Sequence, residues 1–128
     1  MDAYEQNALH WVTLYRDAEK LRLLLADENI DINRASSNGL TPLMTAVLYG
    51  FSEGVEIYLG LPDIQVNTQM GEHKNYEGFT ALSVSIVQGY INISRQLLAH
   101  KDIQVIAKLF KEDENDLVDL RLLDQFIS

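Results

Sequence analysis

The sequence contains no cysteine, only two prolines, and about half as many basic residues as acidic ones (10 against 19). Without cysteine the chain can form neither a disulfide nor a thiolate metal site, which is typical of proteins from reducing compartments. It also lacks an uninterrupted apolar run of about 18 residues and a basic-then-apolar N-terminus. The sequence therefore predicts neither a transmembrane helix nor a signal peptide, and we expect a cytoplasmic protein.

The net charge of −9 limits the kinds of partner that the chain is expected to bind. An acidic surface repels phosphate backbones and anionic membranes, so neither nucleic acid nor a membrane is expected as a partner. A positively charged protein is favoured instead, because opposite charge speeds encounter and suppresses wrong partners. The acidic run at residues 112–116 is interpreted as a solvated loop and helix start.

Motifs for catalysis, cofactors and metals are also missing from the sequence. There is no Gly-x-Ser-x-Gly elbow and no glycine-rich phosphate loop, since the glycines are scattered one at a time. Glu72 lies beside His73, but two adjacent residues cannot build a metal site without further ligands. His100 ends an expected helix, where a cation is favourable without any other role. We expect no enzymatic activity, no cofactor and no metal.

What the chain does contain is an internal repeat. Residues 38–43 (NGLTPL) return as residues 77–82 (EGFTAL), and residues 63–66 (DIQV) return unchanged as residues 102–105. Both pairs have the same spacing of 39 residues, and a weaker copy begins at residue 7, which lies 34 residues before Thr41. A period of this length predicts structural units that stack on one another.

The middle copy, Thr-Pro-Leu-Met-Thr-Ala at residues 41–46, is similar to the Thr-Pro-Leu-His-x-Ala signature of ankyrin repeats, which are about 33 residues long. Degenerate forms stand at residues 7–10 and 80–83. The chain thus resembles the ankyrin family over roughly residues 5–106. The resemblance implies an all-α, ankyrin-repeat solenoid of stacked helix-turn-helix units with short β-like fingers.

A chain of 128 residues is expected to form a single domain, spanning residues 1–128. Repeat 1 is expected at about residues 4–37, repeat 2 at about 38–76 with an enlarged finger, and repeat 3 at about 77–106. Helices are predicted at about residues 4–15, 17–26, 42–49, 55–59, 80–88 and 92–99.

The signature is lost after Val105, where Ile106 stands in place of the expected asparagine. Apolar positions over residues 106–111 and 117–127 predict two helices, which we interpret as a C-terminal cap at about residues 107–128 that covers the last core face. The alternatives are a helix that docks onto another protein and the end of a longer array.

The second finger is longer than the first, because residues 67 and 78 are 11 apart whereas the equivalent residues 33 and 39 are 6 apart. It contains His73, Lys74 and Tyr76. Loops on a rigid scaffold often carry binding residues, so the finger is expected to be functional, with a neutral insertion as the alternative.

In ankyrin proteins, partner contacts usually come from the finger tips and from the two positions before each helix-ending glycine. By resemblance, those helix positions are Leu14 and Tyr15, Leu48 and Tyr49, and Val87 and Gln88. The row is apolar and rich in tyrosine, as binding hot spots are, although its side chains could instead pack against one another. Leu40 and Phe79, which follow the finger glycines, are expected to extend it. The predicted partner-binding residues are Tyr15, Leu40, Leu48, Tyr49, His73, Lys74, Tyr76, Phe79, Val87 and Gln88.

His10 occupies the histidine position of the signature, and the resemblance gives it a structural role, tying a finger to a helix by hydrogen bonds. The leading functional hypothesis is a non-enzymatic adaptor or scaffold, a monomer that binds a protein partner through its concave helix face and finger loops. The alternative is a regulatory or targeting module of a larger protein, including a secreted effector of an intracellular microbe that acts in the host cytoplasm. The start at Met1 and the cap-like end favour an independent protein.

Overall fold

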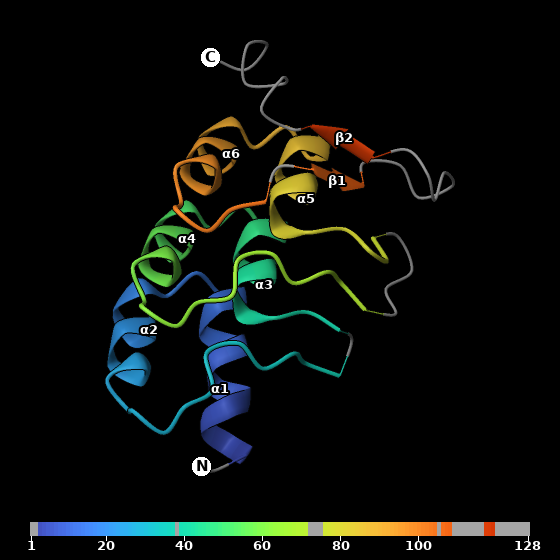
Figure 1. Cartoon of the computed structure of the whole chain (residues 1–128). Helices are drawn as coiled ribbons and strands as arrows, with labels where there is room; N and C mark the ends of the chain where they lie inside the picture. The colour runs from blue at the N-terminus through green and yellow to red at the C-terminus, as the bar shows by residue number, and fades with distance from the viewer. Residues whose placement is uncertain (1–2, 38, 72–75, 105, 109–116, 120–128) are drawn as a thin grey trace.

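The computed structural model describes residues 3–37, 39–71, 76–104, 106–108 and 117–119. Three helix pairs follow one another along the chain: α1 (Ala3–Leu14) with α2 (Ala18–Leu25), α3 (Pro42–Leu48) with α4 (Ser52–Leu59), and α5 (Ala81–Val87) with α6 (Ile91–Leu98). The pairs stack in chain order, so that α1, α3 and α5, which we call the inner helices, form one row and α2, α4 and α6, the outer helices, form the other (Figure 1). The predicted all-α solenoid is therefore confirmed. No helix among the described residues has the length and apolar character that a membrane span needs.

Two fingers project from the same side of the stack, and their described residues are 33–37 with 39–40 and 67–71 with 76–79 (Figure 1). In the first finger, the Ser36 N–H donates to the Leu40 carbonyl oxygen at 2.8 Å. In the second, the Met70 N–H donates to the Phe79 carbonyl at 2.7 Å, and the Gly78 N–H donates to the Met70 carbonyl at 2.9 Å. Each finger is thus closed by backbone hydrogen bonds like a hairpin, although none of its described residues forms a regular strand.

The inner helices α3 and α5 begin where the sequence predicts. The Thr41 hydroxyl accepts a hydrogen bond from the Met44 N–H at 3.2 Å, and Pro42 occupies the first helical turn, where its missing N–H removes no helical bond. Thr80 caps α5 in the same way, accepting from the Ser83 N–H at 3.2 Å. The threonine common to both repeats therefore sets the start of both helices.

The inner helices end at residues in the left-handed region. Gly50 follows α3 with φ of 70°, and Gly89 follows α5 with φ of 75°. After α1 the same place is taken by Arg16, whose φ is 60°. A side chain strains this conformation because its β-carbon approaches the following carbonyl oxygen. The first unit therefore carries strain that the other two units avoid.

Replacing Arg16 with glycine is expected to raise the free energy of unfolding by about 1 kcal/mol, because glycine adopts this φ without strain. Gly89→Ala is the matched control with the opposite sign. A β-carbon at Gly89 meets no heavy atom within 4 Å, so the expected loss of about 1 kcal/mol is conformational alone. Urea denaturation of both variants measures the two changes, and a loss of stability in Arg16→Gly would contradict the account of strain.

The core is formed by equivalent residues of successive units. Leu9, Leu43 and Leu82 occupy the same position in the three inner helices, and all are buried. A buried hydrogen bond links the first two units, since the Tyr58 hydroxyl lies 2.6 Å from the Thr13 hydroxyl. Thr13 donates its own proton to the Leu9 carbonyl at 2.7 Å, so Tyr58 is the donor to Thr13. Burial raises the pKa of Tyr58 and keeps its hydroxyl protonated.

Asparagine side chains tie each unit to the next beneath the fingers. Asn33 and Asn67 each donate to a backbone carbonyl of the following unit and accept from a backbone N–H two residues further on. The contacts are Asn33 to Asp63 O at 2.9 Å and Gln65 N at 2.8 Å, and Asn67 to Asp102 O at 2.7 Å and Gln104 N at 2.7 Å. The next position at the repeat spacing is Ile106, which has no side-chain amide. This ladder therefore cannot continue beyond the third unit.

The helices predicted over residues 106–111 and 117–127 are wrong at the residues that the structure describes there. β1 (Ile106–Lys108) and β2 (Leu117–Asp119) pair antiparallel, with Ala107 opposite Val118, and β1 lies against α5. The periodicity of a short apolar segment does not distinguish a helix from a strand, and the prediction of helices was wrong for this reason. Residues 109–116 and 120–128 lie outside the described residues, so the capping role of residues 107–128 stays a prediction.

Candidate functional site

The two residues before each helix-ending position project from the inner helices and leave apolar surface uncovered. Tyr15 is 72% exposed, Tyr49 43% and Val87 49%, whereas Leu48 is partly buried. Single exposed apolar side chains are ordinary, but Tyr15 and Tyr49 stand at equivalent positions, and Val87 one residue before that position, at the ends of helices that are direct neighbours. We call this set the exposed row. It consists of Leu14, Tyr15, Leu48, Tyr49, Val87 and Gln88.

Trp11 joins the exposed row and was not predicted from the sequence. It lies on α1 one helical turn before Tyr15 and is 54% exposed. The two rings stack with centroids 5.5 Å apart and planes 13° from parallel. The spacing of four residues, which places two side chains on the same helix face, was the signal available in the sequence. The resemblance to ankyrin repeats points only to the two positions before each helix end, and Trp11 lies a turn earlier.

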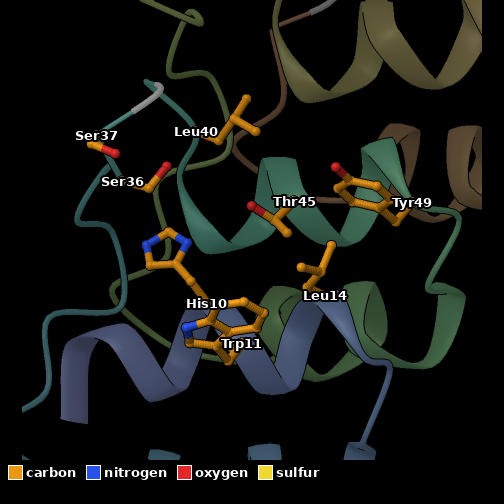
Figure 2. Close-up of a pocket in the computed structure, with 8 residues that line it drawn as sticks. All are labelled: His10, Trp11, Leu14, Ser36, Ser37, Leu40, Thr45 and Tyr49. Carbon is orange, nitrogen blue, oxygen red and sulfur yellow. The ribbon is translucent and has the colours of Figure 1, made fainter. Parts of the chain in front are cut away.

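A cleft of about 400 Å³ opens beside this aromatic pair, between α1, the first finger and α3 (Figure 2). The helices supply aromatic and aliphatic side chains, and the finger supplies two serines at its rim. The lining residues are His10, Trp11, Leu14, Ser36, Ser37, Leu40, Thr45 and Tyr49. None of these carries a carboxylate, an ammonium or a guanidinium group, so the cleft is an aromatic and hydroxyl-lined space.

His10 fixes one wall of the cleft by binding the finger. Its Nε2 lies 3.1 Å from the Arg34 carbonyl oxygen, and since a carbonyl can only accept, Nε2 carries the proton. Burial lowers the pKa of His10, and the bond to Arg34 only partly offsets this effect. The ring is therefore neutral at pH 7, with an unprotonated Nδ1. The predicted hydrogen bond from His10 to a finger is confirmed.

The lowered pKa of His10 predicts a pH dependence of stability. The unfolded histidine takes up its proton near pH 6.5, whereas the folded one does so only at lower pH. The contribution of neutral His10 is therefore fully present above about pH 6.5 and is lost as the pH falls through the folded pKa. Wild type is expected to lose more stability than His10→Gln between about pH 7.5 and about pH 5.5. Urea denaturation at both values measures this, and equal losses in the two proteins would contradict it.

The second finger is tied to the end of α5 by a side-chain contact. The Gln88 amide donates to the Tyr76 hydroxyl at 2.6 Å, and the Tyr76 ring packs edge-on against Phe79 with centroids 5.5 Å apart. Tyr76 is partly buried and Gln88 is exposed. His73 and Lys74 lie outside the described residues. The structure therefore brings Tyr76, Phe79 and Gln88 together, and the role of the finger in binding stays a prediction.

Leu40 and Phe79 do not extend the exposed row as predicted. They are 3% and 2% exposed and belong to the core. Each stands directly before a helix-capping threonine, a position from which apolar side chains pack against the helix that follows. Leu40 still contributes to the floor of the cleft. Among the residues that the structure describes, no group of three or more histidine or acidic side chains has an arrangement suited to a metal ion.

A comparison with known protein families supports the interpretation of the helix pairs as repeats. Residues 1–70 match the family model described as ankyrin repeats (3 copies). The matched segment is more than half of the chain and covers α1 to α4, while the third helix pair follows it with the same geometry. The chain belongs to the ankyrin-repeat family, whose members serve as protein-interaction modules.

Similar proteins include SMC5-SMC6 complex localization factor protein 1 from three mammals. The protein from Homo sapiens is 35% identical over 96 residues, which are 74% of this chain and 8% of the relative. The Bos taurus protein is 33% identical over the same shares, and the Mus musculus protein is 41% identical over 66 residues, or 51% of this chain and 6% of the relative. The chain spans less than a tenth of the length of these relatives.

Proposed function

We propose that the chain is a non-enzymatic adaptor that binds a partner protein through the exposed row and the adjoining cleft. The observation that carries this proposal is the exposure of Trp11, Tyr15, Tyr49 and Val87, which all lie in or directly after the last turn of neighbouring inner helices. Tryptophan and tyrosine offer large contact areas and lose little side-chain entropy when they bind. Three exposed aromatic side chains and an exposed valine together are more typical of a binding surface than of a surface that only faces water.

The stacked units make this surface well suited to recognition. The capped inner helices and the asparagine ladder hold the row in one arrangement before a partner arrives. A preorganised surface avoids much of the entropy loss that association otherwise requires. The net charge of −9 favours a basic partner over nucleic acid or a membrane, and the proposal includes a monomer that works in the cytoplasm.

A targeting role within a larger protein is the second candidate. It is favoured by the relatives, which are named as localization factors of the SMC5-SMC6 complex and are more than ten times as long as the matched segment. In that role the exposed row would hold one partner while other parts of the protein act elsewhere. Both candidates make the same demand on the exposed row, since each needs it to bind a protein.

Affinity capture from a cell extract with matched variants tests the proposal. Tyr15→Ala/Tyr49→Ala removes two exposed side chains from the row, and Leu23→Ala/Glu56→Ala removes two exposed side chains from the outer helices α2 and α4. A protein that wild type and the outer-helix variant retain, and the row variant loses, is expected. Equal retention by the row variant, at equal stability, would contradict the proposal.

A further inference from the structure

The cleft beside Trp11 contains hydrogen-bond acceptors that the described residues do not use. The Thr45 hydroxyl donates its proton to the Thr41 carbonyl at 3.2 Å, which leaves its oxygen free to accept. His10 donates through Nε2 to Arg34, which leaves Nδ1 as an acceptor on the same wall. Both residues line the cleft (Figure 2). Within the described residues no donor reaches either atom, so these two acceptors are available to an incoming group.

The aromatic rings also favour a positively charged group. Trp11 and Tyr15 are stacked and largely exposed, and Tyr49 stands on the opposite wall. The faces of these rings carry partial negative charge and attract cations, tryptophan most strongly. Ring faces and unused acceptors therefore favour a group that is both a cation and a multiple hydrogen-bond donor.

We propose that the cleft between α1, the first finger and α3 receives an arginine side chain of the partner protein. This inference rests on the proposed function and specifies how the partner is recognised. A guanidinium group is planar, stacks on aromatic faces and carries five N–H donors, so it meets both features of the cleft at once. The net charge of −9 attracts such a group over longer distances.

Other occupants fit the cleft less well. An aliphatic side chain would bury the acceptors of Thr45 and His10 without donors, which is unfavourable. A carboxylate would face acceptors and the negative faces of the rings. Arg16 and Arg34 are close in sequence to residues of the cleft and could attract a carboxylate. Their side chains are exposed, however, so water and salt screen their charges. Neither of them lines the cleft.

Intrinsic fluorescence can report binding in the cleft, because Trp11 is the only tryptophan in the chain. A blocked glycine-serine peptide with a single arginine is titrated into the full chain while Trp11 fluorescence is followed. Two peptides serve as controls, one with citrulline, which is the neutral isostere of arginine, and one with norleucine. Ionic strength is matched with potassium chloride. We expect a saturable change with arginine and about tenfold weaker binding of citrulline.

Two variants place the arginine in the cleft. Tyr49→Ala removes a ring that lines the cleft and is 43% exposed, and Thr45→Val removes an acceptor at nearly constant volume, so both are expected to weaken binding of the arginine peptide severalfold. Leu23→Ala, on the outer helix α2, is expected to leave it unchanged. If Thr45→Val is too unstable to assay, Tyr49→Ala alone tests the site.

Two results would overturn the inference. Equal affinity for arginine and citrulline would show that charge does not matter, and absence of a saturable fluorescence change with arginine would show that the cleft does not take it. Neither result bears on whether the exposed row binds a protein, because capture with the row variant measures that separately.

Discussion

Tyr58→Ala is expected to lower the free energy of unfolding by about 4 kcal/mol, because it removes a fully buried aromatic side chain from the interface between the first two units. The substitution leaves a cavity between α4 and α1 and deprives the Thr13 oxygen of its donor. Domains of this size are stable by only about 5–15 kcal/mol, so the loss is a large fraction of the total. Urea denaturation followed by circular dichroism measures it.

Tyr58→Phe is the matched control, since it removes only the hydroxyl group. The expected loss is about 1–2 kcal/mol, which corresponds to the hydrogen bond with Thr13 in a buried site. This variant stays measurable even where Tyr58→Ala does not fold. Equal stability of Tyr58→Phe and wild type would contradict the assignment of Tyr58 as a link between units.

Trp11→Ala is expected to weaken binding of the captured partner by about 2 kcal/mol, or about 30-fold, because tryptophans beside a cleft are frequent binding hot spots. The free energy of unfolding is expected to change by less than about 1 kcal/mol, since Trp11 is 54% exposed and loses mainly its stacking on Tyr15. Isothermal titration calorimetry with the purified partner measures the affinity. A large loss of stability with unchanged affinity would make Trp11 a structural residue instead.

The fold could be predicted where local chemistry and the repeat agree. Thr41 and Thr80 are separated by the repeat spacing, and both cap helices in the structure. Gly50 and Gly89 end those helices with positive φ, as their place after an apolar segment indicates. Arg16 could not be identified in this way, because an arginine in the left-handed region has no local sequence signal.

The secondary structure of the segment after Val105 could not be predicted from the repeat and local chemistry. Its apolar residues fit a helix and a strand equally well, and pairing of Ile106–Lys108 with Leu117–Asp119 depends on contacts between residues distant in sequence. The replacement of asparagine by Ile106 did indicate that the repeat signature, and with it the row of asparagine contacts, ends there. The sequence therefore located the boundary but not the structure beyond it.

The candidate site could be predicted in part. Exposed positions of Tyr15, Tyr49 and Val87 follow from the repeat, because a residue just before a helix end is not needed for stacking. Leu40 and Phe79 are predicted to extend the exposed row because they follow the finger glycines, whereas their position before a capped helix turns them inward. The cleft depends on where the first finger lies over α1, which no local pattern in the sequence specifies.

Methyl chemical-shift mapping of the chain with its captured partner tests the central claim most directly. The account predicts that the shifts of Leu14, Leu48 and Val87 change on binding, whereas those of Leu23, Leu59 and Leu98 on the outer helices do not. Both sets contain partly buried and exposed side chains, so differences in exposure alone would not produce this pattern. Changes confined to the outer helices would contradict the claim that the exposed row binds the partner.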